Sequence, residues 1–238
     1  MRKILSIILM TVMTIPLASA HYMWVETSPA GKLNQEQTIK VHFGEYTYGV
    51  IEKVGGDGFN AVKDFQLFVI DPKGKKTELE VSAQEDHYLA SFTPKKEGTY
   101  TIVLDNDQID VIDYTQYDFG IFRTHYNSIA KVQIGEKEAD TTAQNEEGIA
   151  LQRLVSEDGI KLLVTYQGKP LAENEVKVFV ADQWSKTLET DENGVVSFQL
   201  PWQTKYIVET TIKEEVPGQF RGKDYEFIWH CATAYINN

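Results

Sequence analysis

The sequence predicts an all-β protein of two β-sandwich domains that follow a cleaved signal peptide. Short segments rich in Val, Ile, Phe, Tyr and Thr alternate with polar residues and end at Gly, Pro, Asp or Asn. Helical periodicity is almost absent after residue 20. Residues 135–148 contain no large apolar side chain and carry five acids against one lysine. We therefore expect an immunoglobulin-like sandwich over 21–135, an acidic linker or loop over 136–148, and a second β-sandwich over 149–238.

Residues 1–20 have the pattern of a secretory signal. Arg2 and Lys3 precede an apolar run, which ends in Ala18-Ser19-Ala20, the small residues that signal peptidase requires. The run is short for a membrane-spanning helix and lacks a stop-transfer flank. The sequence thus predicts a periplasmic or secreted protein without a stable membrane anchor, whose mature chain begins at His21.

Seven strands are expected in the first half. "DPKGKK" and "TPKKEGTY" supply Pro and Gly between them, where tight turns need a fixed or positive φ. The expected strands are 21–27, 37–43, 65–71, 77–83, 87–93, 98–105 and 117–134.

Seven more strands are expected after the linker, and part of this half resembles a known fold. "GKPLA", "TDENG" and "VSFQLP" lie within 168–210 in the order seen in transthyretin-like or carboxypeptidase-regulatory-like sandwiches. This resemblance implies that the second sandwich, over 149–238, is transthyretin-like. "DENG" is interpreted as a turn, because Asn-Gly accepts positive φ. The expected strands are 149–156, 159–167, 174–181, 185–191, 194–200, 204–213 and 225–236.

Charge and cysteine content restrict the class of partner. The formal net charge is −12, and removal of Arg2 and Lys3, with no acid lost, lowers it by two to −14. Nucleic acid is therefore not expected to bind, whereas cations are. Cys231 is the one cysteine of the sequence, so no intramolecular disulfide can form. We expect it to be a buried, inert thiol.

His21 is the first candidate metal ligand. Cleavage after Ala20 would free its α-amine, which can chelate one ion together with its own imidazole. A further imidazole would complete a set of nitrogen ligands suited to Cu, Ni or Zn. The alternative is that His21 merely happens to follow the signal.

His230 and His125 are the next candidates. His230 lies among apolar residues in "YEFIWHCATAYI", so its ring nitrogens need hydrogen bonds or a metal. A hydrogen-bonded core imidazole explains it equally well. His125 shares a strand face with Arg123, and we rank His42 and then His87 below these three, because His87 resembles a surface residue. Asp105 belongs to an acidic stretch for which two interpretations stay open: capture of a cation by oxygen ligands, and the favoured one, a solvated loop on an acidic protein.

Several stretches in order resemble one family. They are "HYMWVETSPAGKLNQEQTIKVHFGEYTYGVIEK", "PKKEGTYTIVLDN", "RTHYNSIAKVQIG" and "WHCATAYI". The chain resembles the secreted bacterial domain-of-unknown-function family 4198, once labelled a nickel-uptake substrate-specific region. The resemblance implies an extracytoplasmic protein of two sandwiches linked to uptake of nickel or cobalt. It also implies that His21, His125 and His230 are candidates for the ligands.

These observations together predict a carrier and not an enzyme. It would bind nickel, cobalt, copper or zinc through His21, His230 and His125, with a carboxylate such as Glu45 nearby, and pass the ion to an uptake transporter or outer-membrane receptor. The sequence contains no H-E-x-x-H, G-x-S-x-G or phosphate-binding loop. One alternative is a structural or interaction module without metal. Another is a copper-dependent oxidase with an N-terminal histidine brace.

Overall fold

The computed structural model describes residues 21–136, 145 and 148–237, and this part of the chain is almost entirely β. Its helical elements are short: α1 (Asp57–Asn60), and the 3-10 turns η1 (Tyr46–Tyr48) and η2 (Thr115–Tyr117). The described residues include no helix long and apolar enough to cross a membrane. The predicted signal peptide and most of the predicted linker lie outside the described residues.

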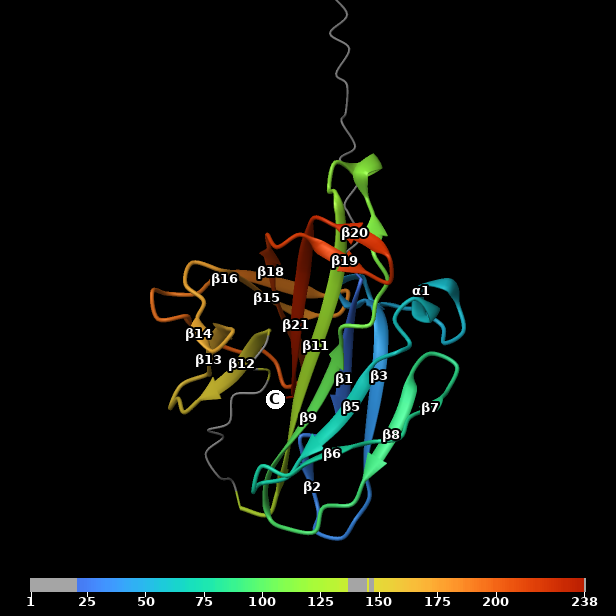
Figure 1. Ribbon diagram of the computed structural model, residues 1–238. Helices are drawn as coiled ribbons and strands as arrows, with labels where there is room; N and C mark the ends of the chain where they lie inside the picture. Colours follow the sequence, from blue (N-terminus) through green and yellow to red (C-terminus); the bar gives the residue numbers. More distant parts are fainter. Residues whose placement is uncertain (1–20, 137–144, 146–147, 238) are drawn as a thin grey trace, which may run out of the picture.

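One ten-stranded sheet passes through the whole molecule (Figure 1). Its order is β16-β15-β18-β21-β11-β9-β5-β6, with β10 and β2 paired to β11. The strands are β16 (Trp184–Glu189), β15 (Glu175–Val180), β18 (Lys205–Glu214), β21 (Phe227–Asn237), β11 (Ile121–Ile134), β9 (Gly98–Asn106), β5 (Gln66–Ile70), β6 (Lys76–Glu78), β10 (Ile112–Asp113) and β2 (Ala30–Gly31).

Three smaller sheets complete the described structure. The first joins β1 (Tyr22–Thr27), β3 (Gln37–Glu45), β8 (Tyr88–Phe92), β7 (Ser82–Ala83) and β4 (Val50–Ile51). The second joins β12 (Ile149–Leu154), β13 (Ile160–Tyr166), β14 (Lys169–Pro170) and β17 (Val195–Phe198). The third is the hairpin of β19 (Gly218–Phe220) and β20 (Lys223–Tyr225).

The two halves of the chain meet where β11 and β21 pair in parallel. Both strands run side by side through the middle of the molecule (Figure 1). Their register extends from Phe122 opposite Phe227 to Ala130 opposite Tyr235. The final strand of the chain is therefore part of the same sheet as strands from the first half.

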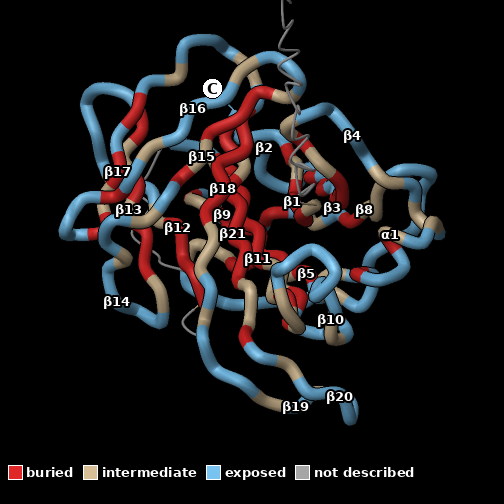
Figure 2. The backbone as a smooth tube through the Cα atoms, turned by 90° about the horizontal axis from the view of Figure 1, so that it is seen from above, coloured by how far each residue is buried: buried red, intermediate tan, exposed pale blue. Residues whose placement is uncertain are grey.

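Buried side chains form cores on both faces of this sheet. One core lies mainly between β12–β13–β17 and the strands β15, β18 and β21, and includes Val164, Val178 and Tyr206. A second joins β1 and β3 to β5, β9 and β11, and includes Val41 and Ile102. Figure 2 shows that the central strands β9, β11, β18 and β21 are mostly buried, whereas β19 and β20 extend outward. Apolar side chains at alternate positions of these strands supply both cores.

All fourteen predicted strands contain an observed strand, and the prediction of an all-β fold is confirmed. The segment 77–83 was expected to be one strand and is two, because β6 pairs with β5 in the large sheet and β7 pairs with β8 in another. The short elements β2, β4, β10, β14, β19 and β20 were not predicted, since two or three residues carry no detectable alternation. The division of the chain into two domains stays a prediction.

Candidate metal centre

The parallel pairing of β11 and β21 places His125 directly beside His230. Paired residues of neighbouring strands project from the same sheet face, and here the two ring centroids are 5.3 Å apart with an interplanar angle of 61°. His230 is 5% exposed. Two residues far apart in the sequence thus form one pair of imidazoles.

Each imidazole of this pair donates a hydrogen bond to a carboxylate. His125 Nε2 donates to Asp105 Oδ1 at 2.6 Å, and His230 Nε2 donates to Glu214 Oε2 at 2.9 Å. The hydroxyl of Tyr166 lies 3.4 Å from the same nitrogen of His230. A carboxylate bound to one ring nitrogen fixes the tautomer and leaves a lone pair on the other nitrogen, as is usual for histidines that bind metal.

The second nitrogen of His230 is buried and unpartnered. Its Nδ1 has no hydrogen-bond partner in the described structure. Because buried polar atoms are nearly always hydrogen-bonded, an unpartnered lone pair in this position fits a metal ligand. Burial lowers the pKa of His230, although the bond to Glu214 acts in the opposite direction. The neutral ring that a metal requires is therefore favoured at neutral pH.

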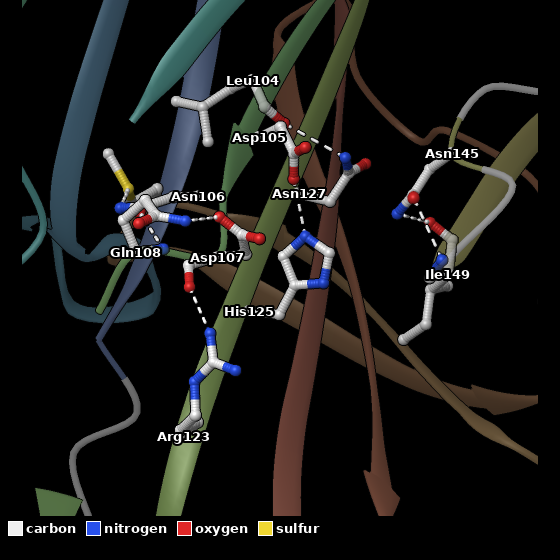
Figure 3. Close-up of polar contacts among 12 residues, drawn as sticks. Leu104, Asp105, Asn106, Asp107, Gln108, Arg123, His125, Asn127, Asn145 and Ile149 are labelled. Carbon is white, nitrogen blue, oxygen red and sulfur yellow. Dashed lines mark hydrogen bonds and ion pairs between the residues drawn. The ribbon is translucent and has the colours of Figure 1, made fainter. Parts of the chain in front are cut away.

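A small pocket opens in front of the two rings. Figure 3 shows His125 directed toward Asp105, with Asn127 beside it and Asn145 across from it. Asn145 is held in place by Ile149, whose carbonyl accepts a bond from Asn145 Nδ2 at 3.1 Å. The pocket walls come from both halves of the chain: Asn127, Asn145, Ile149 and Ala232 surround the rings. The polar side chains of Asn127 and Asn145 therefore border the space beside both rings.

His21, the third predicted ligand, lies elsewhere. Its ring packs on Phe43 and its Nε2 lies 3.0 Å from Glu52 Oε1. Its carbonyl accepts a hydrogen bond from the hydroxyl of Tyr126 at 2.8 Å. Tyr126 follows His125 in β11, so these side chains point to opposite faces of the sheet. The structure therefore brings His125 and His230 together and leaves His21 on the other side of β11.

Three predicted ligands thus do not form one centre in this structure. Across residues 21–136, 145 and 148–237, no three His, Cys, Asp or Glu side chains are grouped so as to hold a metal ion. Glu52, which contacts His21, was not predicted, and Glu45 lies at the end of β3. Glu214 was not predicted either, because no sequence pattern indicates that β18 aligns its last residue near His230.

Cys231 is a buried free thiol, as predicted. Burial raises the pKa of this thiol well above its ordinary value. It packs with Trp24 and Ile207, on the face of β21 opposite to His230. The thiol therefore has neither the ionisation nor the neighbouring base of a nucleophile.

The described structure is that of an all-β protein with several sheets and a pair of carboxylate-bound imidazoles. The chain belongs to the family described as "Domain of unknown function (DUF4198)", whose model matches residues 18–214. The predicted resemblance is thereby confirmed. A comparison with curated proteins finds no match.

Solved structures resemble the chain only distantly. A mutant of Salmonella alpha-2-macroglobulin is 9% identical with a TM-score of 0.32, over 94% of this chain and 15% of that chain. A DUF4785 family protein from Legionella pneumophila is 11% identical with a TM-score of 0.30, over 79% of this chain and 51% of that chain. Salmonella alpha-2-macroglobulin reacted with methylamine is 10% identical with a TM-score of 0.31, over 92% and 15%. The chain thus spans at most about half of these structures.

Proposed function

We propose that this protein binds a divalent transition metal, such as nickel, cobalt, copper or zinc, at the His125–His230 pair. One observation carries the proposal: the buried Nδ1 of His230 has no partner, beside a second imidazole whose Nε2 is likewise bound to a carboxylate. Imidazole nitrogens suit these metals, and copper would bind most tightly in vitro whatever the biological cargo.

The spacing of the rings agrees with a shared ion. With a metal–nitrogen distance of about 2.1 Å and tetrahedral angles, two imidazoles on one ion have centroids roughly 5 Å apart. The observed centroid distance is 5.3 Å. Two protein ligands leave further coordination positions to water or to a receiving protein. Such a site exchanges its ion readily, as a carrier must.

We further propose that the carrier acts in the periplasm or outside the cell, as the signal sequence indicates, and supplies an uptake transporter or outer-membrane receptor. Its halves would be an immunoglobulin-like and a transthyretin-like sandwich. Separate cores on the two faces of the large sheet support this division. The chemistry needs no reacting substrate, so the proposed role is binding and transfer and not catalysis.

Equilibrium dialysis tests the binding proposal. The chain beginning at His21 is dialysed against Ni²⁺, Cu²⁺ and Zn²⁺, together with the variants His125→Ala and His230→Ala. We expect each variant to lose at least about tenfold in affinity for one ion, because each removes a nitrogen ligand. Glu78→Gln, at an exposed carboxylate of β6, is the matched control. Unchanged affinity in both histidine variants would favour a structural module without metal.

His21 is tested separately. A chain that starts at His21 is compared with His21→Ala and with a chain carrying one added Gly. If the free amine and the imidazole of His21 chelate a further ion, both changes weaken binding of that ion and leave the His125–His230 ion unaffected. Equal binding by all three chains would remove His21 from the set of ligands. A copper oxidase would in addition require peroxide production by the copper-loaded chain.

A further inference from the structure

A second pair of imidazoles lies on another sheet. His42 is in β3 and His87 directly precedes β8. In the antiparallel register of these strands Val41 is opposite Tyr88, so the next pair is His42 and His87. Their ring centroids are 5.4 Å apart, with an interplanar angle of 44°. This spacing agrees with the roughly 5 Å expected between the centroids of two imidazoles on one ion.

Asp86 binds one nitrogen of each ring. His42 Nδ1 donates to the backbone carbonyl of Asp86 at 3.3 Å, and His87 Nδ1 donates to Asp86 Oδ1 at 2.6 Å. With both Nδ1 atoms protonated, the lone pair of each neutral ring is on Nε2.

The two Nε2 atoms make no hydrogen bond within the described part of the chain. A backbone carbonyl or a carboxylate behind Nδ1 is the usual support of a histidine that binds metal through Nε2. His42 is 5% exposed, whereas the side chain of His87 is 15% exposed. An ion can therefore reach the pair from the side of His87.

The surroundings of this pair also suit a cation. The ring of Trp24 stacks on His42 with centroids 5.2 Å apart. Glu26 lies near enough to His42 to act on it electrostatically, and is itself held by Trp24 and Lys205. Asp86 thus adds negative charge beside the two rings, which favours a bound cation, whereas the charge of Glu26 is balanced by Lys205.

We propose that His42 and His87 form a second binding site for a divalent transition metal, coordinated through both Nε2 atoms and completed by water. This site shares no residue with the His125–His230 pair and does not rest on it. With two protein ligands it holds the ion weakly and releases it quickly. The protein then binds two ions, one at each imidazole pair.

Copper titration isolates the second site. The variant His21→Ala/His125→Ala/His230→Ala keeps His42 and His87 as its remaining imidazoles, so it is titrated with Cu²⁺ while tryptophan fluorescence and bound copper are measured. We expect one bound ion per chain and quenching, because Trp24 stacks on His42. Absence of both binding and quenching would overturn the proposal, even if the first site were confirmed.

Matched variants identify the ligands. In the same background His87→Ala should reduce Cu²⁺ affinity at least about tenfold and abolish the quenching, and Asp86→Asn should reduce affinity about 10- to 100-fold while both rings remain. Replacement of the buried His42 would disturb the core. The second ligand variant is therefore His87→Gln, at the more exposed histidine of the pair. Glu85→Gln, at the neighbouring exposed carboxylate, should bind as the background does. Equal binding by His87→Ala, His87→Gln and the background would contradict the assignment.

Discussion

At the scale of single residues, the chain uses one arrangement twice. In both imidazole pairs an oxygen binds one nitrogen of each ring and leaves the other nitrogen available. The oxygens differ: Asp105 and Glu214 serve the first pair, and Asp86 serves both rings of the second. Because the oxygen partner fixes the tautomer, it decides which nitrogen can bind an ion.

The carboxylate behind His230 gives a direct prediction. Glu214→Gln keeps the size of the side chain but removes the charge that makes His230 a better donor to the metal. We expect metal affinity at the first pair to fall about 10- to 100-fold. A modest loss in the free energy of unfolding accompanies it, because the lowered pKa of Glu214 means that its ionised form stabilises the folded protein. Dialysis and thermal melting of the apoprotein measure the two effects, with Glu78→Gln as control. A loss of stability without a loss of affinity would contradict this role of Glu214.

Glu209 gives a prediction about pH. Burial raises the pKa of this carboxyl to about 7, with Lys177 acting in the opposite direction. An unfolded Glu has a pKa of about 4.3, so the folded state is favoured at low pH. That contribution is lost as the pH rises from about 4.3 to about 7, because over this range the side chain ionises in the unfolded chain but stays protonated in the folded protein.

Glu209→Gln should therefore raise the free energy of unfolding by about 1–3 kcal/mol at pH 8 and by less at pH 5. Urea unfolding at pH 5 and pH 8 measures both free energies. The control Glu78→Gln, at an exposed position, should change the free energy of unfolding at neither pH. The reverse order, in which the variant gains more at pH 5 than at pH 8, would show that Glu209 is ionised without penalty in the folded protein.

At the scale of secondary-structure elements, two buried hydroxyl groups connect β1 to the central strands β11 and β21 through hydrogen bonds. Ser128 Oγ in β11 accepts a bond from the Val25 amide at 3.1 Å and lies 2.7 Å from Thr233 Oγ1 in β21. Thr233 Oγ1 in turn donates to the Met23 carbonyl at 3.0 Å. These contacts join the first strand of the described chain to the last.

Thr233→Val tests this connection. The change keeps the shape of the side chain and leaves the Met23 carbonyl without its buried donor. We expect a loss of about 1–3 kcal/mol in the free energy of unfolding. Thr211→Val in β18 is the control, since its side chain is only half-buried. If both variants lost equal stability, β-branched substitution and not the hydrogen bonds would be the cause.

The strands were predictable from alternation, but their partners were not. The sequence indicated that Arg123 and His125 share a face and that the strand with His230 is apolar on both faces. The parallel register of β11 and β21 joins segments from opposite ends of the chain, and no local pattern encodes such a pairing. The His42–His87 pair was not predictable for the same reason. The sequence alone makes His87 resemble a surface turn residue, and only the pairing of β8 with β3 brings it beside His42.

At the scale of the whole molecule, the large sheet links the two halves. Removal of the second half would take β21 and β18 from the centre of the sheet and expose the edge of β11. Both halves are therefore expected to unfold together, although their cores lie on different faces.

Differential scanning calorimetry measures this coupling. We expect one transition whose calorimetric and van't Hoff enthalpies agree, because β11 and β21 share nine register pairs from Phe122 to Ala130. The variant Thr233→Val should lower the midpoint temperature of this transition without dividing it into two transitions. Two separate transitions in the unaltered chain would show independent domains.

Nitrogen NMR of the imidazole rings shows directly whether His125 and His230 share a metal ion. Histidine ¹⁵N chemical shifts are recorded while Zn²⁺, which is diamagnetic, is added to the chain beginning at His21. We expect the Nδ1 resonances of His125 and of His230 to shift together on binding, while both Nε2 atoms keep their protons toward Asp105 and Glu214. Zn²⁺ that leaves both Nδ1 resonances unmoved, or that displaces the Nε2 protons, would contradict this expectation.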